Sequence, residues 1–362
     1  MNLTIPRSEL DRGLRLAASV AARKPTMPLL GCVLLRASAG RLTLAATDTQ
    51  LSLQAELKAD VSKPGDIALG AQDLRQFVAS APGDSISIAT DGTWADVRSG
   101  KAKYRMAGHA GRDFPKMPEV PAGRDADAVA LQEMLSRAGY AVSNDETRPM
   151  ICGVLVEVDG DSCKVASTSG HMGVRMVRKL AMPSPTGGGQ AIVMARGATE
   201  IVKLLDGHVR CTVSFDARRI YVTADEITIA AALIDQTFPP IDRVIPDTHK
   251  ASAVVDREKL IAAIQRVSPC TTDTRGVRFA STQSGLSLAS ADGEGEEMHD
   301  EIDCEVDGDI KICVAPKYVL NALQHMAGDA ITMRVIGELD PMVLVDNNDA
   351  GHTAVIMPMR YD

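Results

Sequence analysis

Three similar stretches of sequence follow one another along the chain and account for nearly all of its 362 residues. Each begins with apolar residues at helical spacing and continues into two alternating, strand-like runs. Leu10 and Leu131 hold the same place in the first two copies, as do Thr47 and Thr168, and both pairs lie 121 residues apart. A repeat of this length predicts three domains of one fold, with a working surface that belongs to the assembly of copies.

The second half of each copy also keeps one order of elements. A short apolar run precedes a second helix, and another alternating segment follows that helix. The second helices are expected near residues 73–80, 198–205 and 317–326. Two helices and several strands in each copy predict an α+β fold, with domains at residues 1–120, 121–247 and 248–362.

The composition narrows the class of protein. Hydrophobic residues make up 45% of the chain, enough for a substantial core, whereas aromatic residues make up only 3%, which argues against a protein that stacks single-stranded bases. The seven cysteines form no Cys-x-x-Cys pair and are typical of reduced core thiols. The sequence has no signal-peptide pattern and no long apolar run, so we expect a cytoplasmic protein. We also expect no metal and no cofactor.

Charge is distributed unevenly along the sequence. The chain carries a net charge of −8, but the six predicted helices and their ends hold twelve basic and six acidic side chains. If the helices share one side of the assembly, that side attracts phosphate; on charge alone, ordinary solvated helix faces are an equal alternative. The candidates for phosphate contacts are Lys24, Arg75, Arg137, Arg196, Lys203, Arg266 and Lys317.

One predicted strand is basic and another is acidic. Basic residues alternate with less polar ones over 101–106, and acidic residues crowd between 292 and 309. Such strands in different repeats suit a head-to-tail contact between two chains, although two unrelated solvated strands carry similar weight. The predicted interface comprises Lys101, Lys103, Tyr104, Arg105, Met106, Glu294, Glu296, Glu297 and Asp300.

Motifs for catalysis and for ion binding are weak. Ser169 and His171 lie close together in the sequence, but the segment lacks the Gly-x-Ser-x-Gly elbow, so a turn after a strand is favoured over a serine hydrolase. The segment that begins at Asp303 starts like a calcium loop, but Val314 stands where that loop needs glutamate, which favours a strand. No catalytic residue is assigned.

Four motifs in order resemble the bacterial DNA polymerase III beta subunits, the sliding clamps. They are Lys24–Leu30, Asp113–Pro115, Phe238–Pro239 with Arg243–Pro246, and Met357–Arg360. The resemblance covers the whole chain and implies a head-to-tail dimeric ring, with helices lining the hole and antiparallel sheets outside. It implies a non-catalytic processivity factor that slides on double-stranded DNA and tethers the replicative polymerase, the clamp loader and other proteins through short peptides.

The resemblance also implies a peptide pocket between the second and third domains. Its residues would be Leu155, Thr168, Gly170, His171, Pro239, Arg243, Val244, Val355, Ile356, Met357, Pro358, Met359 and Arg360. Where the family commonly has Thr-Asp-Gly-His-Arg-Leu, this chain has Ser169, Met172 and Gly173 at the second, fifth and sixth places. That departure leaves the preferred peptide open and keeps an alternative, an accessory clamp for a repair polymerase or a mobile element.

Overall fold

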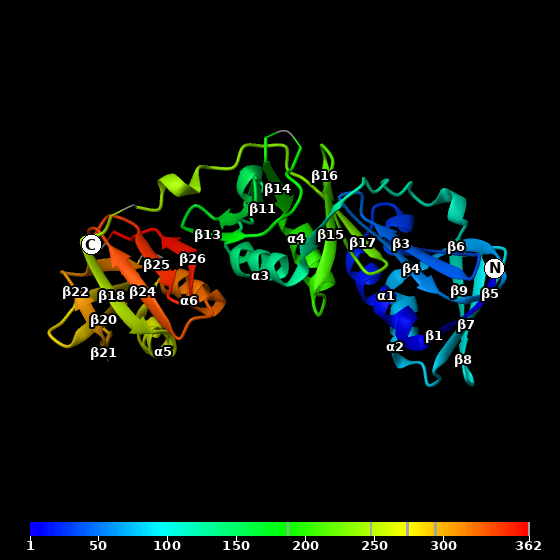
Figure 1. Ribbon diagram of the computed structural model, residues 1–362. Helices are drawn as coiled ribbons and strands as arrows, with labels where there is room; N and C mark the ends of the chain where they lie inside the picture. The colour runs from blue at the N-terminus through cyan, green and yellow to red at the C-terminus, as the bar shows by residue number, and fades with distance from the viewer. Residues whose placement is uncertain (187, 247, 273–274, 293–294, 361–362) are drawn as a thin grey trace. The chain divides into compact units, whose positions relative to one another are not determined.

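The computed structural model describes residues 1–186, 188–246, 248–272, 275–292 and 295–360 (Figure 1). The first helix of each repeat is confirmed, as α1 (Arg7–Val20), α3 (Ala128–Ala138) and α5 (Arg257–Val267). The second is confirmed as α2 (Ala71–Ser80), α4 (Ala195–Leu205) and α6 (Pro316–His325). These six are the α-helices of the described ranges, and none of them is long and apolar enough to cross a membrane.

Contacts divide the chain into two compact units. The first comprises residues 1–132, 182–188 and 196–233. It contains one 13-stranded antiparallel sheet, in the order β10 (Arg124–Asp127), β15 (Arg210–Phe215), β16 (Arg219–Ala224), β17 (Ile227–Ala232), β4 (Leu51–Lys58), β3 (Arg41–Thr47), β2 (Cys32–Ser38), β6 (Gly65–Gly70), β9 (Ala102–His109), β8 (Trp94–Ser99), β7 (Ser85–Asp91), β1 (Asn2–Pro6) and β5 (Asp60–Lys63).

The second unit comprises residues 133–181, 189–195 and 234–362. Its nine-stranded sheet has the order β14 (Gln190–Met194), β11 (Gly153–Asp159), β12 (Ser162–Thr168), β13 (Met172–Lys179), β26 (Asp349–Ile356), β25 (Met342–Asp346), β24 (Ala330–Val335), β18 (Ala251–Asp256) and β22 (Glu305–Asp307). A four-stranded sheet follows the order β21 (Glu297–Asp303), β20 (Gly285–Ala291), β19 (Val277–Ser281) and β23 (Lys311–Val314).

Helices pack on one face of these sheets. In α1, Leu10, Leu14 and Ala17 are fully buried at the helical spacing that the sequence showed. Gly13 lies on the same side, and a Cβ atom there would come within 2.7 Å of the Leu44 side chain on β3. The missing side chain therefore lets α1 approach the sheet closely, and Figure 1 shows α1 beside α2 below β3 and β4.

Two strand pairings join one repeat to the next. In the first join, β4 pairs with β17, and Ser52 lies opposite Ala230. In the second join, β13 pairs with β26, and Gly173 lies opposite Val355. Because hydrogen-bonded strand pairing continues from one repeat into the next, the repeats share sheets instead of meeting only through side chains.

Aromatic residues from the chain segments after the first two repeats cover the outer faces of the sheets. Phe114 packs on Leu34, Ala45 and Ala68 in the first unit. In the second unit, Phe238 and Ile241 pack on the apolar cluster formed by Leu155, Ala166 and Ile192. Each linking segment therefore adds a small second core on the side of the sheet away from the helices.

Two local predictions are confirmed. Residues 169–171 form the turn between β12 and β13, in which the Ser169 backbone N–H donates to the Met172 carbonyl over 3.0 Å. The acidic segment that begins at Asp303 contains the end of β21 and all of β22, as its alternation indicated. The predicted domain boundaries at residues 120 and 247 stay predictions.

Candidate peptide pocket, helix face and open strand edges

A cavity of about 370 Å³ opens in the second unit where β13 and β26 meet. Its walls are largely apolar and include Met172, Ile241 and Val355. Val244 and Met357 are partly exposed at its edge, at 41% and 38%. A hollow with apolar walls and few polar groups suits short peptides with hydrophobic anchors.

The turn after β12 shapes one wall of this cavity. The Thr168 hydroxyl donates to the Met172 carbonyl over 2.8 Å and accepts the Gly170 backbone N–H over 3.1 Å. Gly170 has a φ of +87°, a left-handed conformation that a larger residue adopts only with strain. The Met357 backbone N–H donates to the His171 carbonyl over 2.9 Å, which fixes the end of β26 against the turn.

Gly173 determines how deep the cavity is. A Cβ atom at this position would lie 3.0 Å from Ile241 Cδ1 and 3.2 Å from Val355 Cγ1. A leucine here would therefore occupy space that the cavity now holds open. Glycine instead of leucine at position 173, the departure found in the sequence, therefore makes the cavity deeper at this point.

The structure brings together part of the predicted pocket. Six of the predicted residues line the cavity: Thr168, Gly170, Pro239, Val244, Val355 and Met357. Leu155 and Ile356 are buried in the surrounding cores. The His171 ring stacks on the Tyr318 ring, with centroids 5.8 Å apart. Pro358 forms an isolated β-bridge with Val314, and Arg243 is the last residue of the short 3₁₀ helix Ile241–Arg243. Met359 and Arg360 line a different cavity.

Other lining residues were not predicted as pocket residues. They are Arg148, Met150, Ile151, Met172, Gly173 and Ile241. The sequence feature that could have predicted these lining residues is the presence of apolar residues beside the Pro149 turn and after Phe238–Pro239. Arg148 is the cation of the site, and its Nε donates to Asp145 over 2.8 Å. Hydrogen bonds from Thr147 and then Arg148 lower the pKa of Asp145, which keeps that carboxylate ionised.

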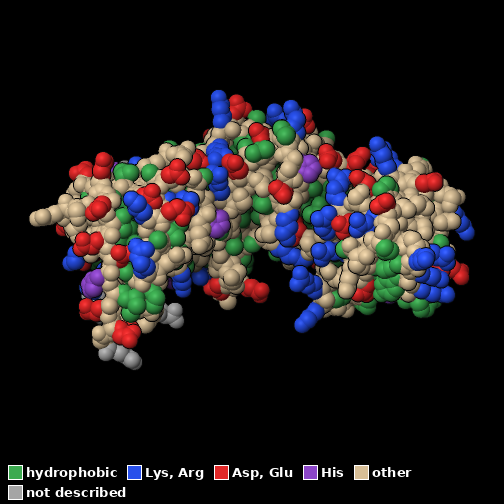
Figure 2. All heavy atoms as spheres, turned by 90° about the horizontal axis from the view of Figure 1, so that it is seen from below, with side chains coloured by type: hydrophobic (Ala, Val, Ile, Leu, Met, Phe, Trp, Pro, Cys, Tyr) green, Lys and Arg blue, Asp and Glu red, His purple; other side chains and the backbone are tan. Residues whose placement is uncertain are grey.

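The seven predicted phosphate-binding residues have different surroundings. Lys24 and Arg75 are exposed and make no ion pair with any residue that the structure describes. Lys317 is also exposed and lies over the Tyr318 ring, 5.1 Å from its centroid. Figure 2 shows Lys and Arg side chains interspersed with Asp and Glu on the viewed face of both units.

The other four predicted residues have acidic partners. Lys203 pairs with Glu200 at 2.7 Å, and Arg266 pairs with Asp300 at 2.5 Å. Arg137 is only 25% exposed and lies 3.8 Å from Asp349. Internal pairing of this kind reduces the positive charge that these residues offer to a ligand.

Arg196 has a structural task that the sequence did not indicate. It forms an ion pair with Asp48, and its Nη2 donates to the Ser19 and Val20 carbonyls over 2.8 and 2.9 Å. These carbonyls lie at the end of α1, where helical partners are lacking. Arg196 therefore ties α4 to the end of α1 within the first unit.

The predicted interface residues lie on two strand edges with open stretches. β9 pairs with β8 along residues 102–107 but with β6 only at residues 108 and 109. Among the strands that the structure describes, β21 pairs with β20 alone and forms the edge of its sheet. Lys103, Arg105 and Glu297 are exposed, whereas Met106 is buried. Glu294 lies outside the described residues.

The remaining predicted interface residues are all close to these edges. Lys101 is exposed in the turn before β9, and Glu296 is exposed just before β21. Tyr104 is half-buried and contacts Phe77, with ring centroids 5.7 Å apart. Asp300, on β21, accepts a hydrogen bond from Arg266 Nε of α5 and forms an ion pair with the same guanidinium. One strand edge therefore carries mainly basic side chains, and the other carries mainly acidic ones.

The Ser169 and His171 pair lacks the geometry of a hydrolase. The buried Ser169 hydroxyl oxygen has no hydrogen-bond partner among the described residues, and the His171 ring stacks on Tyr318. A nucleophile needs a base within hydrogen-bond reach. The turn assigned from sequence accounts for both residues.

Three domain families match the chain in order. The N-terminal domain of the DNA polymerase III beta subunit matches residues 1–118, the central domain residues 127–240, and the C-terminal domain residues 242–360. Curated relatives agree. The beta sliding clamp of Pseudomonas aeruginosa is 28% identical over 99% of this chain and 100% of the relative, and that of Chlamydia muridarum is 24% identical over 99% of each.

Solved structures share the fold. The Pseudomonas aeruginosa DNA polymerase III beta subunit bound to griselimycin superposes with a TM-score of 0.94, at 26% identity over 100% of both chains. The Thermotoga maritima beta subunit shares the fold, with a TM-score of 0.93 at 22% identity over 100% of both chains. Neither the accessory clamp nor the hydrolase is favoured by these matches. The chain belongs to the family of bacterial DNA polymerase III beta subunits, the beta sliding clamps.

Proposed function

We propose that this chain is a processivity factor for DNA polymerase III, a non-catalytic subunit that forms a head-to-tail dimeric ring around duplex DNA. One observation carries the proposal. β4 and β13 each pair with the last strand of the following repeat, whereas β21, which holds the same place in the third repeat, has one edge that no described strand pairs with. The corresponding last strand of the first repeat, β9, also has an open edge along residues 102–107.

The two joins within the chain suggest a register for a third join between copies. Ser52 pairs with Thr47 on one side and Ala230 on the other, and Gly173 pairs likewise with Thr168 and Val355. In the third repeat the same place belongs to Glu297, which pairs with Ala291 on β20.

On the other side of the contact, Arg105 is the fourth residue of β9, as Ala230 is of β17. Glu297 of one copy would therefore lie opposite Arg105 of the other. Counting onward along both strands, Glu301 would lie opposite Lys101. Opposite charges on facing residues favour this register over a slipped one.

A charge swap tests the dimer contact. Arg105→Glu should reduce the dimer affinity at least tenfold in analytical ultracentrifugation, and Arg105→Glu combined with Glu297→Arg should restore most of it. The matched control is Arg98→Glu, an exposed arginine on the neighbouring strand β8. If the double variant is no better a dimer than Arg105→Glu alone, the proposed register is wrong.

The helix cations would hold DNA through its phosphates without reading sequence. Lys24, Arg75 and Lys317 are the best candidates because they are exposed and make no ion pair with a described residue. Reversing all three to glutamate should shorten retention on nicked circular DNA and reduce its salt dependence. The control reverses Lys58, Lys63 and Lys179, which are exposed on strands. Equal retention by both triple variants would contradict the assignment.

The cavity at Gly173 would bind the short peptides of polymerase and loader subunits. Its apolar walls and the cation Arg148 support this role. Val244→Glu would place a charge at the rim and should weaken binding of a polymerase C-terminal peptide at least tenfold, measured by fluorescence anisotropy. An unchanged affinity would place the peptide elsewhere. A cytoplasmic location fits this role.

A further inference from the structure

A second, larger cavity lies on the outer face of the four-stranded sheet and has a volume of about 830 Å³. Its lining includes Arg278 on β19, Ala289 on β20 and Cys313 on β23. Leu339, with 71% of its surface exposed, stands at its rim. It shares no lining residue with the cavity at Gly173.

Internal repetition shows what usually fills this place. Arg278 lies opposite Ala289 on one side and Cys313 on the other. In the first repeat the same row is Ala45, Leu34 and Ala68. In the second repeat it is Ala166, Leu155 and Ile192.

The first two rows are each covered by a phenylalanine followed by proline. Phe114 covers the first row and Phe238 covers the second. The aromatic residue among the described residues that line the cavity is Phe279, which is buried in β19 itself and does not come from a cover segment. The segment after the third repeat contributes Met359 and Arg360, and the Met359 backbone N–H donates to the Cys313 carbonyl over 2.7 Å. In the described part of the chain, the third face thus has the site of a cover segment without an aromatic anchor from that segment.

The second cover segment also shows which polar group accompanies the aromatic one. Asp242, four residues after Phe238, accepts hydrogen bonds from Lys164 and Arg175 of the sheet, each over 2.9 Å. Burial alone would raise the pKa of Asp242, but these two hydrogen bonds outweigh it and lower the pKa. The cover is therefore held by an apolar anchor and by a carboxylate on basic strand residues.

The third face is also lined mainly by basic side chains. Arg278, His299, Lys311 and Arg360 line the cavity with one acidic residue, Glu338. Arg278 has an interaction of its own, and His299 lies 3.5 Å from Glu297. His299 occupies the place of Arg175, because each lies opposite the alanine of its row. Lys311 is paired with Glu338 at 2.6 Å but is still 69% exposed.

We propose that this cavity is a second peptide-binding site, specific for a partner segment with an aromatic residue, a following proline and a carboxylate about four residues further on. The ligand would lie across β19 and β20 as residues 238–242 lie across β11 and β12. The site goes beyond tethering through the cavity at Gly173, and it would let one clamp chain hold two different peptides.

A peptide copied from residues 235–243 of this chain is the probe. Labelled with fluorescein, it should bind the full-length dimer in an anisotropy titration. Replacing its phenylalanine by alanine should weaken binding at least tenfold, and replacing the aspartate that corresponds to Asp242 by asparagine about fivefold. Absence of binding by the unmodified peptide would overturn the proposal.

Protein variants distinguish the two cavities. Ala289→Phe, which fills the floor, and Leu339→Glu, which adds a negative charge at an exposed rim position, should each reduce binding of the probe at least fivefold. Val244→Glu, at the other cavity, should leave this affinity unchanged. Loss of probe binding in Val244→Glu with full binding in Leu339→Glu would overturn the proposal. The proposed function is tested separately, by the mass of the dimer and by loading of the clamp onto DNA.

Discussion

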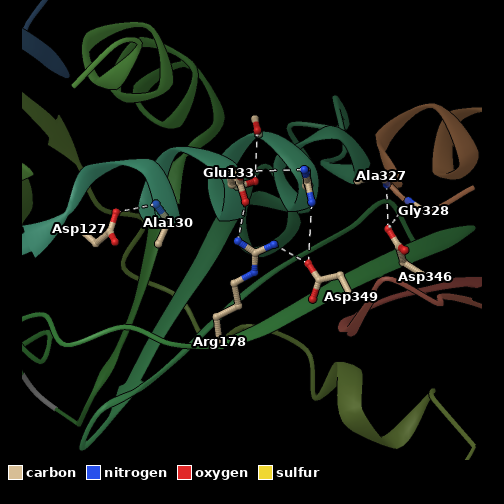
Figure 3. Close-up of polar contacts among 10 residues, drawn as sticks. Asp127, Ala130, Glu133, Arg178, Ala327, Gly328, Asp346 and Asp349 are labelled. Carbon is tan, nitrogen blue, oxygen red and sulfur yellow. Dashed lines mark hydrogen bonds and ion pairs between the residues drawn. The ribbon is translucent and has the colours of Figure 1, made fainter. Parts of the chain in front are cut away.

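The two joins within the chain share one strand register but differ in the side chains around it. At the first join, Arg196 and Asp48 form an ion pair, and Ser19 donates to Glu200 between α1 and α4. At the second join, Arg178 of β13 bridges Glu133 and Asp349, each at 2.5 Å, as Figure 3 shows. Backbone pairing thus sets where repeats meet, and the surrounding side chains set how strongly, and at which pH, they hold.

The second join also buries a histidine, whereas the buried ionisable group described at the first join is the carboxylate of Glu200. His352 on β26 is fully buried, and neither of its ring nitrogens has a hydrogen-bond partner in the described part of the chain. Nearby, the Tyr140 and His325 rings stack with centroids 4.1 Å apart. We therefore expect the second join to be the more sensitive to acid.

The largest expected effect comes from Arg178→Ala. Removing the guanidinium leaves the partly buried Glu133 and Asp349 to share Arg137, which should lower the free energy of unfolding by about 3 kcal/mol. Urea denaturation followed by circular dichroism measures this. The control is Arg41→Ala, whose exposed pair with Glu56 should contribute about 0.5 kcal/mol. If the two variants lose equal free energy of unfolding, the ion pairs of Arg178 at the second join contribute no more than an exposed surface pair.

Acid should weaken the second join through His352. Burial lowers the pKa of this imidazole to about 4, a direction that Asp346 and Asp349 oppose and that Arg137 and His325 reinforce. Because the unfolded chain binds the proton near its ordinary pKa, the stabilisation is complete above about pH 6.5 and is lost as the pH falls toward 4. The total loss should be about 3 kcal/mol.

Comparing His352→Gln with the unmodified chain isolates this contribution. The free energy of unfolding of the variant should change less between pH 7 and pH 4.5, whatever its value at pH 7. Urea titrations of both proteins at both pH values give the four free energies of unfolding that the comparison needs. Identical pH dependence in the two proteins would show that another group senses acid.

Arg196→Ala tests the first join. Losing the donors to the Ser19 and Val20 carbonyls should lower the free energy of unfolding by about 2 kcal/mol. Arg210→Ala, an exposed arginine paired with Asp125, should change it by only about 0.5 kcal/mol. If Arg196→Ala reduces DNA retention at unchanged stability, its main task is phosphate contact.

The smallest effect is expected from Ser19→Ala. Glu200 is only 4% exposed and accepts the Ser19 hydroxyl over 2.6 Å and the Lys203 ammonium over 2.7 Å. Without the hydroxyl, Lys203 remains as partner, so a loss of about 1 kcal/mol is expected. A loss as large as that of Arg178→Ala would contradict the ranking of the two joins.

Periodicity predicted the helices and most strands because it reflects burial within one repeat. It could not predict the joins, since β4 and β17 meet across more than a repeat of sequence and their pairing depends on backbone hydrogen bonds. The resemblance located the cavity at Gly173 only in part. Leu155 and Ile356 have the apolar character of pocket residues but are used in cores, while Arg148 and Ile151 reach the cavity through a local turn.

Charge counting was similarly incomplete. It identified Lys24, Arg75 and Arg196 by residue type, but only the folded structure distinguishes a cation that is open to solvent from one that already donates to helix carbonyls. Asp48, whose carboxylate pairs with Arg196, lies 148 residues away in sequence. A sum over helices cannot include such partners.

Each copy presents one open edge of each kind, at β9 and at β21, and this has a consequence for assembly. Complementary edges of unlike type can join copy after copy, so the contact proposed above to close a pair could also build an endless helical filament. Which product forms depends on the rotation accumulated per repeat, not on the strength of any one contact. A substitution that bends β4 against β17 could therefore turn a closed particle into a polymer while every interface residue stays intact.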